Sequence, residues 1–215
     1  MIKGKKVLAI IPCRSGSKGI KNKNILKLNG VPLVNYSILF AKKLKFVDKI
    51  LVTTDSKRYQ KIINSQGNFS PFLRPKKISK DLSIDIDFIK HALDWLKKNE
   101  NFNPDFIVHL RPTSPLRKLQ DVENAIKKIA NDSSIDSVRS VSKLNKPIEK
   151  IWYKNLKGIL KQVAKQNRKF KEPFNAPRQS LTQVYSQNAL FDVNKIDNIK
   201  KNDLLSGKKI FGYLT

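Results

Sequence analysis

The stretch Val7–Asn24, VLAIIPCRSGSKGIKNKN, contains the features on which the fold prediction depends. A continuous apolar run leads up to Pro12, which is typical of a short strand buried on both faces of a parallel sheet. Small residues and cations then alternate, and small residues let a backbone approach a ligand closely. A buried strand that opens into a cationic, glycine-containing loop predicts a phosphate site, although an ordinary basic surface loop is the alternative.

Beyond this loop, helix and strand patterns alternate along the chain. Helices are expected over Pro32–Leu44, Ser56–Gln66, Asp85–Asn99 and Leu119–Ala130, and strands over Lys49–Thr54, Phe106–Leu110 and Ser137–Val141. This order predicts an α/β fold with parallel pairing and right-handed crossovers.

The pattern changes from Ser142 onward. Two short apolar runs, Ile148–Tyr153 and Ile159–Val163, predict a hairpin around Lys157-Gly158, and a long polar stretch follows over Gln166–Gln183. Strands expected over 189–193 and 209–214 return to the sheet. A polar loop this long in a compact domain usually binds something or packs on a partner. Because no internal repeat or low-complexity linker is evident, we expect one domain over residues 1–215 with a hairpin and arm inserted at about 142–185.

Composition limits the possible classes of protein. The 215 residues suffice for one folded domain, and no apolar run approaches the roughly 20 residues needed to cross a bilayer. The formal net charge of +27 favours polyanionic partners, but the lysines are scattered, which favours a solvated surface over a nucleic-acid footprint. A single cysteine, Cys13, and the absence of a secretory signal in MIKGKK predict a cytoplasmic protein. The scattered lysines and the lack of a long apolar run predict no nucleic-acid or membrane partner.

Three loops follow three predicted parallel strands and should converge on one rim of the sheet. That rim is expected to hold the cations Arg14, Lys18, Lys23, Arg111 and Arg117. A polyphosphate fits such a site, because arginine offers a planar fork and lysine a point charge. Asp55 could contact a base, ribose or metal, accept a hydrogen bond from Lys18, or cap the next helix.

Other chemistries lack their sequence signatures. The loop has neither P-loop nor Rossmann spacing, and no cluster of histidine and cysteine has zinc-ligand spacing. His91 and His109 are interpreted as core residues.

Several motifs in order, IPCRSGSKGIKNKNI, VTTDS, FLRP, LRPTSPLR and RQSLTQVYSQN, resemble the acylneuraminate (CMP-sialic acid) cytidylyltransferase family over about Val7–Val193. Asp85 and Asp87 before HALDWL resemble one branch of it. The resemblance implies a three-layer, Rossmann-like nucleotide-diphospho-sugar transferase fold with a mostly parallel sheet, and an arm that forms a homodimer. It also implies that CTP and an acidic 2-keto sugar react, with Mg²⁺, to give the CMP-sugar and pyrophosphate.

The resemblance also implies roles for individual residues. Arg14 and Lys18 would be catalytic, and the triphosphate would be held by Arg14, Ser17, Lys18, Lys23 and Asn24. Arg74 and Ser83 would contact cytosine. The sugar would be held by Arg111, where other members carry glutamine, together with Thr113, Arg178, Gln187 and Asn188.

The sequence departs from the family at its acid-binding end and at its C-terminus. Ser186 stands where many members have arginine, and Ala189 follows Asn188 where many have glycine. The family's Asp-x-Asp metal element would follow KKIFGYL, and the sequence ends at Thr215 before it, so the metal ligands are unknown. A truncated or non-catalytic nucleotide-binding member, and a cytidylyltransferase for another acidic sugar such as Kdo, are the alternatives.

Overall fold

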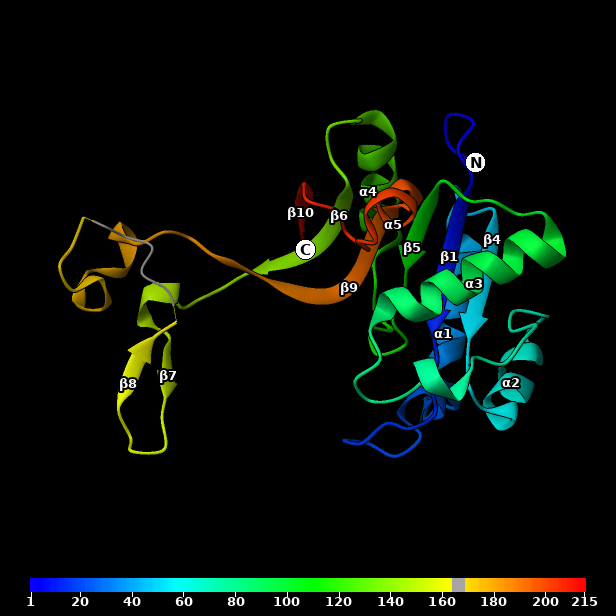
Figure 1. Ribbon diagram of the computed structural model, residues 1–215, viewed down its shortest axis with the longest axis horizontal. Coiled ribbons are helices and arrows are strands. Elements are labelled where there is room, and N and C mark those ends of the chain that lie inside the picture. The colour runs from blue at the N-terminus through cyan, green and yellow to red at the C-terminus, as the bar shows by residue number, and fades with distance from the viewer. Residues whose placement is uncertain (164–168) are drawn as a thin grey trace. The chain divides into compact units, whose positions relative to one another are not determined.

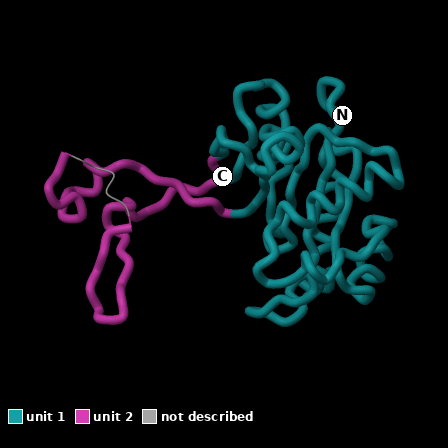
Figure 2. The backbone as a smooth tube through the Cα atoms, viewed as in Figure 1, with its two compact units in different colours: residues 1–140, 189–213 teal, residues 141–188, 214–215 magenta. Residues whose placement is uncertain are grey.

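The computed structural model describes residues 1–163 and 169–215, and divides them into two compact units. The first unit contains residues 1–140 and 189–213, and the second contains residues 141–188 and 214–215 (Figure 2). Residues 164–168 lie outside the described residues, and they include the start of the polar stretch predicted from Gln166.

The centre of the first unit is a six-stranded sheet in the order β10-β6-β9-β5-β1-β4 (Figure 1). β1 lies next to β5 and β4 and pairs in parallel with both, whereas β5 pairs antiparallel with β9. The strands are β1 Val7–Pro12, β4 Lys49–Thr53, β5 Phe106–His109, β6 Ser137–Lys143, β9 Tyr185–Lys195 and β10 Ile210–Leu214.

Helices cover both faces of this sheet. The helices are α1 Leu33–Lys43, α2 Lys57–Asn64, α3 Asp85–Glu100, α4 Leu119–Asn131 and α5 Ile196–Asn202. Ala9 and Ile11 of β1 belong to a core cluster with side chains of α1, α2 and α4, whereas Leu8 and Ile10 belong to a cluster with side chains of α3 and α5. This alternation along a strand that is fully buried from Val7 to Ile11 produces three layers, which confirms the predicted α/β fold with a mostly parallel sheet.

Some elements differ from the sequence-based expectation. Helix α5 was not predicted, because only Ile196 and Ile199 mark its buried side and seven residues are too few for a clear helical period. The predicted strand over 148–153 starts instead as a 3₁₀ turn at Ile148–Lys150. A short two-stranded sheet of β2, Lys27–Leu28, and β3, Val31–Pro32, also lay outside the expectation.

The second unit is built around the predicted hairpin, whose strands are β7, Trp152–Lys154, and β8, Leu160–Gln162. The Trp152 ring packs edge-on against Phe174, with ring centroids 4.9 Å apart. This unit also contains three 3₁₀ turns among its described residues, Ile148–Lys150, Pro173–Asn175 and Arg178–Ser180. In neither unit is a described helix long and apolar enough to span a membrane.

Candidate functional site

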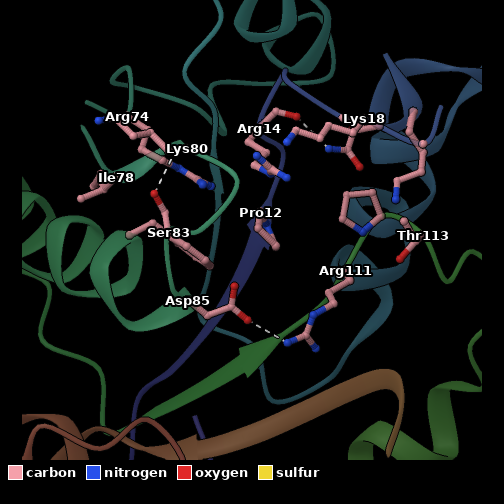
Figure 3. A pocket seen from close by; sticks show the side chains of 16 residues that line it. Pro12, Arg14, Lys18, Arg74, Ile78, Lys80, Ser83, Asp85, Arg111 and Thr113 are labelled. Atoms are coloured by element: carbon pink, nitrogen blue, oxygen red, sulfur yellow. Dashed lines mark hydrogen bonds and ion pairs between the residues drawn. The ribbon is translucent and has the colours of Figure 1, made fainter. Parts of the chain in front are cut away.

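A cavity of about 430 Å³ lies where the first unit's parallel strands β1 and β5 end (Figure 3). Pro12 ends β1, Arg111 to Thr113 follow β5, and Asp85 begins α3, so separate elements meet there. The described lining consists of Pro12, Arg14, Ser17, Lys18, Gly19, Lys23, Asn24, Arg74, Ile78, Lys80, Ser83, Asp85, Phe88, Arg111, Pro112 and Thr113.

Most of the predicted site residues line this one cavity. They are Arg14, Ser17, Lys18, Lys23, Asn24, Arg74, Ser83, Arg111 and Thr113. The structure thus brings together residues that the sequence separates by up to about a hundred positions. Two further charged residues, Lys80 and Asp85, also line the cavity, and neither of them was assigned a role there from the sequence.

The other three predicted sugar-binding residues belong to the second unit. Arg178 opens a 3₁₀ turn and lines a small pocket with Gln183. Gln187 and Asn188 lie on β9, and the Asn188 amide donates to Ser142 Oγ at 2.8 Å.

Asp55 holds the cationic loop in place. Its carboxylate accepts hydrogen bonds from the backbone N–H and the hydroxyl of Ser15, both at 2.8 Å. Ser56 caps α2 instead, since its Oγ accepts from the Tyr59 N–H at 3.3 Å. Of the alternatives for Asp55, capping of α2 is therefore wrong, because Ser56 is the cap, and acceptance from Lys18 is wrong, because Lys18 Nζ contacts Asp81 instead.

Arg74 is a buried cation at the cavity wall. It is 5% exposed, and its Nη2 donates to the Thr53 carbonyl at 3.0 Å and to the Thr53 hydroxyl. The guanidinium also stacks over Phe88, 4.4 Å from the ring centroid. Burial lowers the pKa of Arg74 to about 10, so the group is still charged at neutral pH.

Arg111 connects two carboxylates from different elements. Its Nη2 donates to Asp85 Oδ2 at 2.8 Å, as Figure 3 shows, and its Nη1 donates to Asp192 Oδ2 at 3.0 Å. Burial lowers the pKa of Arg111, but these two carboxylates outweigh burial and raise it above its usual value. Asp192 also accepts from Arg139 Nε at 2.8 Å.

Arg117 does not belong to the described cavity lining, contrary to the predicted rim. It is 8% exposed, and its guanidinium donates to the carbonyls of Leu190 and Arg111 and to Ser37 Oγ. These hydrogen bonds connect the loop after β5 to α1 and β9, so Arg117 supports the loop instead of facing the cavity.

His109 is a core residue on β5, as expected. It is fully buried beside Phe88, with ring centroids 5.8 Å apart, and neither ring nitrogen has a hydrogen-bond partner among the described residues. Burial lowers the pKa of His109 to about 3, so the imidazole is neutral.

The charge of the cavity lining is strongly positive. Its cations are Arg14, Lys18, Lys23, Arg74, Lys80 and Arg111, and Asp85 is the single acid of the described lining. A water-accessible cavity of this charge at strand carboxyl ends binds polyanions such as nucleotide phosphates. The fold and this cavity define the class: an α/β protein with a cationic cavity at the carboxyl ends of its parallel strands.

Comparison with known proteins shows to which family the chain belongs. Residues 8–211 match the model of the family described as cytidylyltransferase. The chain belongs to this cytidylyltransferase family.

Two curated relatives are similar over most of the chain. An N-acylneuraminate cytidylyltransferase of Escherichia coli is 35% identical over 195 residues, covering 88% of this chain and 42% of that protein. The post-translational flagellin modification protein B of Campylobacter coli is 31% identical over 206 residues, covering 94% of this chain and 83% of that protein. The chain therefore spans less than half of the Escherichia coli relative.

A solved structure supports the fold. The structure of CMP:2-keto-3-deoxy-manno-octonic acid synthetase complexed with CTP aligns with a TM-score of 0.67 at 15% identity, covering 98% of this chain and 90% of that one. At this level of identity the match concerns the fold alone.

Proposed function

We propose that this chain activates an acidic 2-keto sugar of the sialic acid type with CTP, giving the CMP-sugar and pyrophosphate. The observation that carries the proposal is the cationic cavity at the ends of β1 and β5 in a member of the cytidylyltransferase family. The sugar's anomeric hydroxyl oxygen attacks the α-phosphorus of CTP and loses its proton to solvent, the bond from the α-phosphorus to the α–β bridging oxygen breaks, and pyrophosphate leaves with that oxygen. Catalysis of this step rests on positioning and charge neutralisation.

The phosphates would be held by the loop after β1. Arg14 and Lys18 would neutralise charge on the leaving pyrophosphate and thereby act as catalytic residues, helped by Ser17, Lys23 and Asn24. The Asn24 amide donates to the Arg14 carbonyl at 2.9 Å, which supports a role in shaping the loop as well.

Cytosine would lie on the opposite wall of the cavity, against Arg74 and Ser83 (Figure 3). The rigid position of Arg74 supports this assignment, because an immobilised donor loses little entropy when a base binds. Arg111 and Thr113 would contact the sugar, together with Arg178, Gln187 and Asn188. Arginine is a natural partner for the sugar's carboxylate.

A divalent cation, Mg²⁺, fits this cavity only if substrate phosphate oxygens supply some of its ligands. The described residues contain no group of three or more histidine, cysteine or acidic side chains that could hold a metal. Asp85 lines the cavity, and in the described chain its Oδ1 has no hydrogen-bond donor. Mg²⁺ commonly binds one or two carboxylates plus substrate phosphates, so Asp85 would hold it there to neutralise phosphate charge.

The inserted segment at about 142–185 would serve as a dimerisation arm within a single cytidylyltransferase domain. Large apolar side chains of the hairpin are exposed, including Leu156 at its turn and Tyr153 and Ile159 on either side. Burial of such side chains against a second copy would stabilise a dimer. We further propose a cytoplasmic location, consistent with a single, buried Cys13.

The experiment is to measure pyrophosphate release from CTP and Mg²⁺ with a panel of sialic-type acids and Kdo. We expect release with one acid, and none with ATP in place of CTP. CTP binding without release would identify a nucleotide-binding member without turnover. Absence of CTP binding, or polyanion binding that collapses steeply with salt, would contradict the proposal and favour a nucleic-acid partner.

A further inference from the structure

The two cations assigned to pyrophosphate are already paired in the structure, and with the same carboxylate. Arg14 Nη1 contacts Asp81 Oδ1 at 2.8 Å, and Lys18 Nζ contacts Asp81 Oδ2 at 2.8 Å. Each oxygen of Asp81 therefore serves one cation. Among the described residues, Arg14 and Lys18 have no other acidic partner.

Asp81 is held where it can make both contacts. It lies in a turn between Lys80 and Ser83, in which the Lys80 N–H donates to Ser83 Oγ at 2.9 Å and the Ser83 N–H donates to the Lys80 carbonyl at 3.1 Å. Both ends of this turn line the cavity. Hydrogen bonds from Lys18 and then Arg14 lower the pKa of Asp81, so the carboxylate stays charged at neutral pH.

We propose that Asp81 is an internal counter-anion of the phosphate loop, which pairs with Arg14 and Lys18 and is displaced by a bound polyphosphate. The inference rests on the proposed function for the identity of that polyphosphate. Phosphate oxygens compete for the same donors, and the nearby carboxylate repels them. Asp81 therefore lowers the affinity for pyrophosphate and speeds its release.

The exposure of the three side chains makes such an exchange feasible. The side chains of Arg14, Lys18 and Asp81 are 33%, 82% and 38% exposed. Ion pairs at this exposure are weak, because water screens them and two long side chains must be ordered. A polyphosphate, with several charges and many acceptor oxygens, replaces the single carboxylate readily.

The test is the affinity for inorganic pyrophosphate, measured by isothermal titration calorimetry on the full chain. Asp81→Asn should bind pyrophosphate about 3- to 10-fold more tightly than the wild type at low salt, the range expected for losing one or two weak competing pairs. The gain should shrink at high salt, because salt screens exposed charges. Asp94→Asn, the same change at an exposed residue of α3 outside this cavity's described lining, should leave the affinity unchanged.

Pyrophosphate affinity that is unchanged or weaker in Asp81→Asn would overturn the proposal, since the carboxylate would then be neutral to binding or needed to orient the cations. An equal gain in Asp94→Asn would also overturn it, by showing a general charge effect. Asp81→Glu, which keeps the charge, should return the affinity toward the wild-type value. If the wild type binds pyrophosphate and Asp81→Asn binds it more tightly, yet no CTP is turned over, the proposed function fails while this inference stands. If the wild type does not bind pyrophosphate, both are refuted.

Discussion

Replacing Asp55 by alanine tests whether the shape of the phosphate loop determines nucleotide affinity. Asp55 accepts two hydrogen bonds from Ser15, both at 2.8 Å, from the backbone N–H and the hydroxyl. Both residues are partly exposed, so water can replace the lost partner. Asp55→Ala therefore frees the loop without leaving a deeply buried orphan group.

The magnitude follows from these contacts. Hydrogen bonds to charged groups contribute about 1.5–3 kcal/mol each, and water competition at a partly exposed site brings the pair to about 2 kcal/mol in total. If only the ordered loop binds CTP, the affinity scales with the fraction of chains whose loop is ordered, so a shift of about 2 kcal/mol lowers it by up to about 30-fold.

The assay is calorimetric titration of CTP, with thermal unfolding measured in parallel. Asp48→Ala is the matched control, because Asp48 also accepts two hydrogen bonds, from the Val7 N–H at 2.8 Å and from the N-terminal amine at 2.6 Å. Val7 begins β1, whereas the cavity lies beyond its other end. The control should lose stability and keep its CTP affinity. Wild-type CTP affinity in Asp55→Ala would refute the reasoning.

Two further predictions concern buried groups. The pKa of His109 in the folded chain, about 3, lies below its value of about 6.5 in the unfolded chain. As the pH falls, the unfolded chain therefore binds this proton first. The free energy of unfolding should then decrease by up to about 1.4 kcal/mol for each pH unit from about 6 down to 3. Urea unfolding of His109→Leu at several pH values should show a shallower slope over that range, and an unchanged slope would contradict the burial argument. Arg117→Met removes three hydrogen bonds, to the Leu190 and Arg111 carbonyls and to Ser37 Oγ, and should lower the free energy of unfolding by about 3 kcal/mol, roughly 1 kcal/mol for each. A loss below about 1 kcal/mol would show that water or other donors replace these contacts.

Local sequence patterns were sufficient to predict the elements that build the sheet. The apolar run of β1 and the helical periodicity of α1, α3 and α4 are properties of neighbouring residues, and these elements lie within a few positions of their expected bounds. The alternation of strand and helix then implied a parallel sheet with its loops at one edge.

The contacts that shape the cavity could not be read from neighbouring residues. Asp192 and Arg111 are 81 positions apart, and Asp81 and Arg14 are 67 apart. Residue type alone placed Arg117 on the rim, whereas packing turned it beneath the loop to satisfy three acceptors. The sequence left several roles open for Asp55, and only the folded chain shows that its carboxylate accepts hydrogen bonds from Ser15.

The sequence by itself thus determined the order of elements, an α/β fold with parallel strand pairing and the segments that supply the site, because hydrophobic periodicity and strand order depend on local pattern and chain connectivity. The tertiary structure alone decided which charged groups pair, which are buried and which face the cavity. The reason is physical: an ion pair or hydrogen bond depends on distances of about 3 Å between side chains, and only packing sets those distances.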